Sequence, residues 1–532
     1  MSRFNIRTAR PTASSPVTTT GERTHTAEGG TGYLRDAKSE LFLLAVANMV
    51  GQDTFYEAGG QRDDRYTQLI RSLAVADPEW TAGLLGWLRG EGNMRTAALV
   101  GAAEFVKARL DAGKEPGTAV VAAVGPHSNR GVIASVLQRP DEPGELLAYW
   151  TSRYGRAIPK PVKRGIEDAL GSLYTERSFL KYDTGSKGYR FGDVIELVHP
   201  APKALWQGDL FKHAIDRRHN REGEPPLSLS LLQTRAALAE WPLEKRRELL
   251  RRPDAADTLS HAGMTWEALA GWLQGPMDRQ AWEAIIPSMG YMALLRNLRN
   301  FDEAGVSDEV AEKVAKKLAD PEQVARSRQF PFRFLAAYKH APSLRWGHAL
   351  EKALGYSLAN VPPLPGRTLV LVDRSGSMFG GISERTQLNR ADSAAVFGTA
   401  VAARAEQADL VEFGTTSRPV PLGRGESVLR VLDRFHDLGG TNTTAAVRSH
   451  YRSHDRVLIV TDEQASYSFY GDPTEQVPAN VPVYTWNLAG YQAGHGPSGA
   501  ANRHTFGGLT DAAFRMVPLL EAGRDASWPW EA

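Results

Sequence analysis

Three oxygen-bearing side chains follow an apolar run of strand length. In LVLVDRSGSM (369–378), four apolar residues lead into Asp373, Ser375 and Ser377, which occupy every second position. Carboxylate and hydroxyl oxygens are hard ligands, of the kind that Mg²⁺ takes in octahedral geometry while it retains several waters. Taken alone, the stretch is equally compatible with a polar turn at the end of a strand.

Two later stretches offer the same chemistry. GGTNTTAAV (439–447) places Thr441 after a Gly–Gly turn at the start of a predicted helix, and LIVTDEQ (458–464) ends an apolar run in Asp462. Two carboxylates and three hydroxyls at strand ends and a helix start together predict a Mg²⁺ site. The predicted ligands are Asp373, Ser375, Ser377, Thr441 and Asp462.

The elements that must position these ligands lie after a proline-rich joint, NVPPLPGR (360–367). Continuous apolar runs of strand length alternate there with helical stretches such as 389–407, and such alternation predicts a doubly wound, mostly parallel α/β sheet. In such sheets ligands gather at the carboxyl ends of the strands. The predicted strands are 368–372, 408–413, 455–460 and 481–488.

With these motifs in order, residues 365–525 resemble a von Willebrand factor A domain with its metal-ion-dependent adhesion site. The resemblance implies metal-binding roles for the five ligands above. It also implies an open metal position for a carboxylate from a protein partner. Glu463 departs from the pattern, because many such domains have glycine there.

A catalytic metal site is the alternative. An Asp-x-Asp phosphatase needs a second aspartate at position 375, where this chain has serine. No GxSxG elbow, Walker A loop or HExxH helix occurs either. We therefore expect binding rather than turnover, with a metal-dependent hydrolase as the less favoured possibility.

Composition narrows the function further. The chain has no cysteine, which excludes disulfides, thiolate metal sites and a cysteine nucleophile. The net charge is only +2, but residues 152–221 contain 14 Lys and Arg against 8 Asp and Glu. This basic segment is either a solvated surface or an anion-binding patch, for which nucleic acid is the usual partner.

Targeting features are lacking in the sequence. No run approaches the length of roughly 18 apolar residues that a membrane span needs. The first 32 residues are too polar for a secretory signal and are predicted to be a disordered or loosely attached tail. We expect a cytoplasmic protein.

Residues 33–362 have the sequence pattern of short amphipathic helices. Examples are 307–320, with a Val310–Val314–Leu318 repeat, 281–301, and two helices within 67–90 separated at an Asp–Pro pair. Stacked helix pairs of this kind predict an α-solenoid of the HEAT type, with an irregular bundle as the alternative. The predicted second domain spans residues 363–532.

Several stretches of the helical half resemble successive parts of the TROVE domain. Followed by an A domain, this layout is similar to that of the Ro 60-kDa autoantigen and its bacterial relatives. The resemblance implies a HEAT-like ring whose hole receives single-stranded 3′ ends of misfolded RNAs. It also implies that the outer surface of the ring binds a small noncoding Y-like RNA. The implied protein partner, in RNA quality control, is an exoribonuclease. The stretches are 51–59, 88–105, 150–170, 188–202 and 292–301.

Candidate RNA-binding residues lie mainly within the basic segment. By resemblance, Lys181 and His199 line the hole and Lys187 is the nearest match to a third position, although the loop before Gly188 is one residue longer than in the family. A helix end capped near His199 is the alternative for that residue. Tyr189 and Phe191 offer aromatic faces but favour core packing. The predicted RNA-binding residues are Lys181, Lys187, Arg190, His199, Lys203 and, on the outer surface, Arg130.

The leading prediction is a non-catalytic RNA-binding scaffold. The alternative is a metal-dependent protein-interaction module, in which the A domain acts and the helices serve as a spacer.

Overall fold

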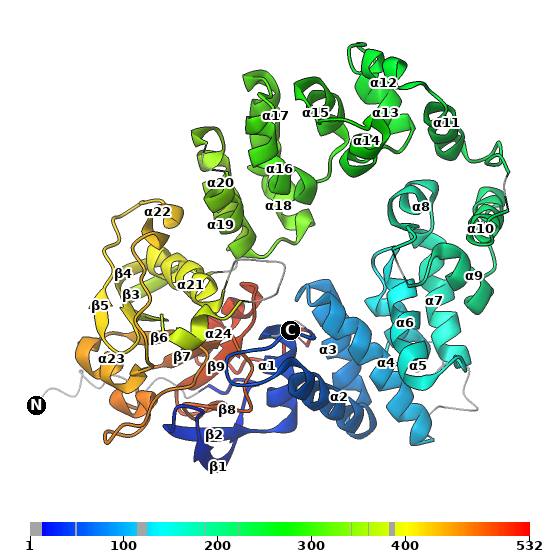
Figure 1. Ribbon diagram of the computed structural model, residues 1–532. Helices are drawn as coiled ribbons and strands as arrows, with labels where there is room; N and C mark the ends of the chain where they lie inside the picture. The colour runs from blue at the N-terminus through cyan, green and yellow to red at the C-terminus, as the bar shows by residue number, and fades with distance from the viewer. Residues whose placement is uncertain are drawn as a thin grey trace, which may run out of the picture.

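The structure is a computed structural model that describes residues 13–47, 50–113, 125–186, 188–221, 223–341, 343–359, 361–381 and 389–531. Its helices follow one another around a ring, and an α/β domain fills the remaining arc (Figure 1). Both ends of the helical arc meet this domain. Helix α1 (Ala37–Ala47) contacts strand β9 (Arg503–Gly507), and α19 (Pro331–His340) contacts α21 (Arg390–Arg404). The predicted helical solenoid followed by an α/β domain is confirmed.

Short helices separated by tight breaks build the ring. No helix in the described part of the chain is long and apolar enough to cross a membrane. Besides α1 and α19, the helices are α2 (Gly59–Ala76), α3 (Pro78–Gly90), α4 (Arg95–Asp111), α5 (Asn129–Val136), α6 (Glu142–Tyr154), α7 (Lys160–Leu173), α8 (Glu176–Tyr182), α9 (Phe191–Val198), α10 (Leu205–Arg218), α11 (Ser230–Ala239), α12 (Leu243–Leu249), α13 (Ala255–His261), α14 (Trp266–Leu273), α15 (Arg279–Ile285), α16 (Tyr291–Glu303), α17 (Asp308–Leu318), α18 (Pro321–Ser327) and α20 (Leu344–Ser357).

Local sequence explains where several helices break. Asp77 ends α2 and caps α3, because its side chain accepts a hydrogen bond from the Trp80 amide while Pro78 occupies the first turn. The helical stretch 281–301 also breaks, at the boundary that Pro287 indicates in the sequence. A 3₁₀ turn at Ile286–Ser288, which contains Pro287, separates α15 from α16.

The α/β domain contains a six-stranded sheet in the order β5-β4-β3-β6-β7-β9, in which only the edge strand β5 runs antiparallel. Alternate residues of β3 enter two different cores, with Val370 and Val372 in one and Leu369 and Leu371 in the other. The sheet is thus covered on both faces, as predicted. Its elements not yet given are β3 (Leu364–Asp373), β4 (Ala405–Phe413), β5 (Ser417–Pro419), β6 (Arg456–Thr461), β7 (Val483–Asn487), α22 (Val428–Leu432), α23 (Thr443–His450) and α24 (Met516–Glu521).

The prediction of a loose tail over residues 1–32 is wrong for its described part. Strand β1 (Thr19–His25) pairs with β2 (Thr31–Arg35), which in turn pairs with β8 (Ala493–Gly494). Ala13 and Val17 are buried. The segment is polar because β1 is an exposed edge strand, and its place in a sheet is not evident locally because β8, the second partner of β2, lies more than 450 residues away in the sequence. The predicted boundary between residues 32 and 33 therefore falls inside β2, and residues 13–35 pack with the α/β domain.

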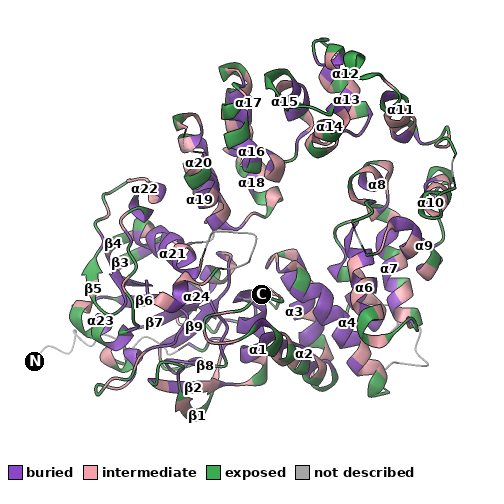
Figure 2. Ribbon diagram, viewed as in Figure 1, coloured by how far each residue is buried: buried purple, intermediate pink, exposed green. Residues whose placement is uncertain are grey.

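The other end of the chain packs on the first helices. Trp528 and Trp530 stack with ring centroids 5.5 Å apart, and Phe42 of α1 and Trp80 of α3 lie 5.2 Å from Trp528. Gly83 allows this approach, since a β-carbon there would meet the Trp530 ring at 2.5 Å. Buried residues accordingly line α1 and α3 where they meet the α/β domain (Figure 2).

Candidate metal centre and nucleic-acid interface

The five predicted metal ligands come from two neighbouring parallel strands and one helix start. Asp373 is the last residue of β3, and Asp462 directly follows β6, its partner in the sheet. Thr441 lies two residues before α23. All five side chains are buried, and none belongs to a residue more than 4% exposed. The fold thus gathers at one sheet edge the ligands that the spacing predicted.

Backbone contacts hold the serine turn against the threonine loop. The Gly376 amide donates to the Gly439 carbonyl over 2.6 Å, which places the loop carrying Thr441 beside the turn. The hydroxyls of Ser375 and Ser377 lie 3.2 Å apart, and Ser377 also hydrogen-bonds to Asp462. Hydroxyls and carboxylates therefore converge on one small buried space.

The two carboxylates differ in how they are held. Asp373 accepts from the Ser375 amide at 2.8 Å and from the Thr461 hydroxyl at 2.6 Å. Asp462 Oδ1 accepts from the Gln464 amide at 3.0 Å, whereas the buried Asp462 Oδ2 has no hydrogen-bond partner within the protein. A buried carboxylate oxygen without a partner is costly, and a cation would satisfy it.

Electrostatics favour a cation at the same place. Burial, followed by repulsion from Asp373, raises the pKa of Asp462 to about 7. Burial also raises the pKa of Asp373. Among the described residues, no three His, Cys, Asp or Glu side chains gather to hold a metal, so hydroxyls must complete the ligand set. The donor set and the unpartnered oxygen fit Mg²⁺.

The predicted RNA-binding residues divide into exposed and engaged side chains. Lys181 in the last turn of α8, His199 and Lys203 are exposed. His199 ends α9 in the left-handed conformation, with φ 55°, and its amide donates to the Ile195 carbonyl. The alternative of a helix end at His199 therefore holds for its backbone, while its imidazole remains accessible. Lys187 lies outside the described residues.

The predicted arginines are already paired. Arg130 forms a two-pronged ion pair with Asp168, with both N–O distances 2.6 Å. Arg190 donates to the buried Asp183 over 2.7 Å. Their guanidinium charges are thus partly neutralised within the protein, and we expect them to contribute less to binding an anion than the exposed lysines.

Asp183 organises the surface around the predicted residues. Besides Arg190, its carboxylate accepts from the Phe191 amide at 2.9 Å and lies 3.9 Å from the Arg217 guanidinium. Phe191 is buried and stacks on Tyr174 at 3.8 Å, which confirms core packing for that ring. One buried carboxylate therefore links α8, α9 and α10.

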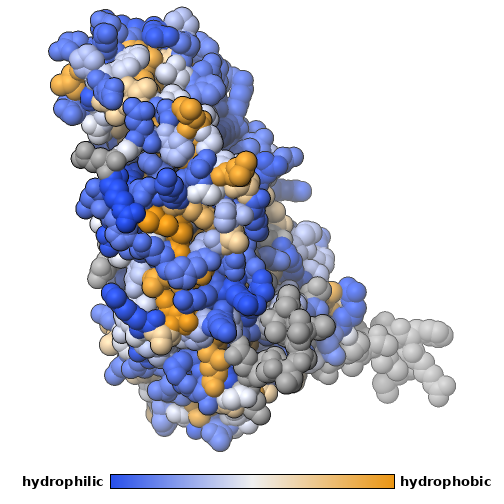
Figure 3. All heavy atoms as spheres, turned by 90° about the vertical axis from the view of Figure 1, so that its right-hand side faces the viewer, coloured by the Kyte–Doolittle hydropathy of each residue, from blue (hydrophilic) through white to orange (hydrophobic). Residues whose placement is uncertain are grey.

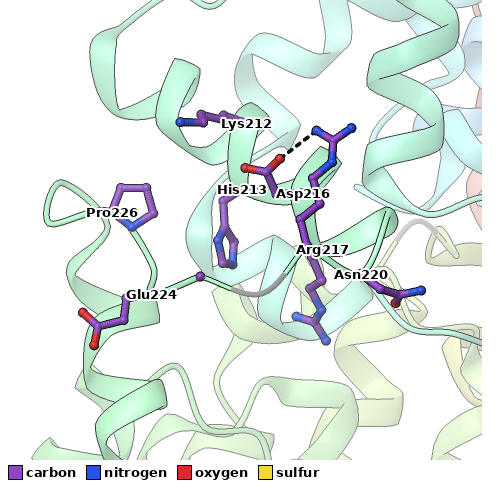
Figure 4. Close-up of a pocket in the computed structure, with 9 residues that line it drawn as sticks. Lys212, His213, Asp216, Arg217, Asn220, Glu224 and Pro226 are labelled. Carbon is purple, nitrogen blue, oxygen red and sulfur yellow. Dashed lines mark hydrogen bonds and ion pairs between the residues drawn. The ribbon is translucent and has the colours of Figure 1, made fainter.

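A pocket of about 750 Å³ opens beside α10 (Figure 4). The side chains of His213 and Arg217 extend from α10 on the same side, and Arg217 also lies 5.3 Å from the centre of the Phe179 ring. Burial and the nearby Arg217 lower the pKa of His213, so its ring is neutral at pH 7. The pocket is lined by Lys212, His213, Asp216, Arg217, Asn220, Arg221, Gly223, Glu224 and Pro226.

Three cations against two carboxylates give this pocket a basic character, and all three cations belong to the basic segment 152–221. Charge composition indicated the segment but not the pocket, which forms only when α10 and the following loop fold together. The outer face on this side of the ring is mostly hydrophilic, with separate apolar patches (Figure 3).

Comparison with known proteins gives a family match within the helical half. Residues 263–345 match the family model of the TROVE domain. The resemblance predicted from the sequence is confirmed. The matched segment runs from just after α13 to the start of α20, along the top of the ring in Figure 1, and does not include the basic segment.

Similar proteins agree with this match. The chain is 29% identical over 150 residues to telomerase protein component 1 of Mus musculus, and 33% identical over 92 residues to that of Rattus norvegicus. These alignments cover 27% and 17% of this chain but only 5% and 3% of the relatives, which are much longer. The crystal structure of the Deinococcus radiodurans RO (RSR) protein superposes with a TM-score of 0.58 at 16% identity, covering 92% of this chain and 99% of that one. The chain therefore shares its overall fold with the Deinococcus radiodurans RO (RSR) protein.

Proposed function

We propose that this TROVE chain binds RNA through its basic segment, with the ring receiving single-stranded 3′ ends of misfolded or structured RNAs. The observation that carries the proposal is that exposed Lys181, His199 and Lys203 and the basic pocket of α10 all belong to the stretch from α8 to the loop after α10. Cations follow the phosphates of a single strand, while polar and aromatic groups contact its bases with little sequence demand.

The finer parts of the proposal rest on the likeness to Ro and TROVE proteins. A small Y-like noncoding RNA would bind the outer surface, where Arg130 is the candidate contact. An exoribonuclease partner would receive the presented 3′ ends, so that the chain acts as a scaffold in RNA quality control in the cytoplasm. The paired state of Arg130 makes it the weakest of these contacts.

The A domain completes the proposal as a Mg²⁺ site without catalysis. Asp373 and Asp462 would hold the ion with Ser375, Ser377 and Thr441, and the bound ion would supply positive charge that neutralises the two buried carboxylates. Both carboxylates would be engaged by the ion, which would leave neither of them to act as a general base. Mg²⁺-dependent RNA cleavage that Asp373→Ala abolishes would overturn the scaffold proposal.

A protein-interaction module is the second candidate function. The burial of all five ligands weighs against an open docking site for a partner. This candidate would gain support if Asp373→Ala abolished binding of a protein partner while RNA binding stayed intact.

Lys181→Ala combined with His199→Ala should weaken binding of a structured RNA that carries a single-stranded 3′ tail by roughly tenfold. The change removes one fixed charge and one polar ring from the proposed path, so the slope of log affinity against log salt should fall by about one. Fluorescence anisotropy with a labelled RNA at several salt concentrations measures both quantities.

The matched control combines Lys313→Ala with His261→Ala, two exposed residues outside the basic segment. Its affinity for the tailed RNA should stay within about twofold of the unmodified protein. A tail-less duplex should lose little affinity in either variant. Equal losses for tailed and tail-less RNA would show that the segment is a nonspecific basic surface.

A further inference from the structure

The N-terminal hairpin lies on the loop that follows the predicted metal ligand Asp462. The Thr26 hydroxyl donates to the Ala465 carbonyl over 2.6 Å, and the Ala27 amide donates to the Gln464 side chain over 2.8 Å. Gly30 makes the close approach possible, because a β-carbon there would lie 2.3 Å from the Ala465 oxygen. The tip of the hairpin is thus built to fit this loop.

Glu463, which directly follows the predicted metal ligand Asp462, holds the hairpin in place. It adopts φ 62°, a left-handed conformation that favours glycine, and its buried carboxylate pairs with Arg35 of β2. The Arg35 guanidinium also donates to the Tyr491 carbonyl at 3.2 Å. The residue that departs from the A-domain pattern therefore binds the chain's own N-terminal segment.

Tyr56 connects the hairpin to the ligands. It lies in the loop between α1 and α2, and its hydroxyl donates to Glu28 Oε1 over 2.5 Å. The same hydroxyl interacts with Ser377, and the Tyr56 ring meets Tyr491 edge-on at 5.6 Å. A single hydroxyl thus stands between the Glu28 carboxylate and a predicted metal ligand.

Mg²⁺ takes six oxygen ligands. The five predicted side chains therefore need waters or a further group to complete the set. We propose that Tyr56 and Glu28 close the metal site from within the chain, with the Glu28 carboxylate acting through the Tyr56 hydroxyl on the side where a partner protein would otherwise supply a carboxylate. Glu28 is exposed on the hairpin, and its carboxylate accepts the hydrogen bond that the Tyr56 hydroxyl donates.

This inference rests on the proposed Mg²⁺ site. Under this inference, bound Mg²⁺ stabilises the contact of the hairpin and the α1–α2 loop with the A domain. A partner's acidic side chain would reach the ion only after the hairpin lifts.

Isothermal titration of the full chain with Mg²⁺, in a buffer free of carboxylates, tests the inference. Glu28→Gln and Tyr56→Phe should each weaken Mg²⁺ binding by about tenfold, the lower end of what loss of a supporting partner costs a metal site. Glu22→Gln is the matched control, because Glu22 is exposed on the same hairpin but away from its tip. Its affinity should not change.

Added sodium acetate gives a second readout. Acetate should raise the Mg²⁺ affinity of Glu28→Gln, whose site lacks the internal carboxylate, and should leave the unmodified protein unchanged. Hydrogen exchange of residues 19–30 should slow on Mg²⁺ addition in the unmodified protein but not in Glu28→Gln.

The outcomes separate the two proposals. If the unmodified protein binds Mg²⁺ and Glu28→Gln binds it equally well, the metal site stands and the internal closure is wrong. If the unmodified protein binds no Mg²⁺ at all, the metal site fails and the closure fails with it.

Discussion

Replacing Trp528 with alanine should lower the free energy of unfolding by about 3 to 5 kcal/mol, the usual cost of truncating a buried tryptophan. The Trp528 ring is 8% exposed and contacts Phe42, Trp80 and Trp530. Its removal leaves a cavity where the C-terminal segment meets α1 and α3. Urea unfolding followed by tryptophan fluorescence and circular dichroism measures the loss.

The matched control is Phe469→Ala, since Phe469 is an aromatic residue of the same domain that is 91% exposed. Its substitution should change the free energy by no more than about 0.5 kcal/mol. Hydrogen exchange should also rise in α1 and α3 of the Trp528 variant, while α16 and α17, far around the ring, stay protected. A Trp528 variant as stable as the control would contradict the packing described for this segment.

Mg²⁺ should stabilise the protein far more at pH 8 than at pH 5. The pKa of Asp462 is raised to about 7 in the folded state, so folding favours its protonated form. The resulting stability is complete below the unfolded-state pKa near 4 and is lost as the pH rises through about 7. Without metal this loss is on the order of 4 kcal/mol. Mg²⁺ binds the ionised form and offsets the loss only where Asp462 has ionised.

Thermal melting with and without Mg²⁺ at the two pH values measures this effect. Asp462→Asn should abolish most of the pH dependence and the response to Mg²⁺ together, because the amide does not titrate between pH 4 and 8. Asp433→Asn, at an exposed position of the same domain, should behave like the unmodified protein. An equal Mg²⁺ shift at pH 5 and pH 8 would rule out Asp462 as the titrating ligand.

Much of the fold could be predicted because its signals are local. Buried runs such as 368–372 are long and apolar enough to define central strands, and the Asp77–Pro78 pair ends one helix and starts the next. The candidate metal ligands could be predicted for the same reason. Their spacing sets the turn after β3, and parallel strands bring their carboxyl ends to one edge.

The features that the sequence did not reveal depend on distant partners. Residues 19–25, TTGERTH, contain no apolar side chain, which is typical of a loose tail, and they form a strand on β2, whose other partner β8 lies far along the sequence. The roles proposed for Glu28 and Tyr56 arise only when the hairpin, the α1–α2 loop and the turn after β3 come together. The pocket of α10 likewise depends on how the loop at 220–226 folds back on the helix.

The pairing of β2 with β8 has a consequence for synthesis. Tyr33 pairs with Gly494, so the hairpin leaves the ribosome about 460 residues before its partner strand. At roughly 5 to 20 residues per second, it waits on the order of 20 to 90 s with its outer edge unpaired. During that interval the helices of the ring are synthesised, while the first two strands still lack β8, the strand with which β2 pairs. The waiting edge belongs to β2, TGYLR, and its short length and terminal arginine limit pairing with other chains.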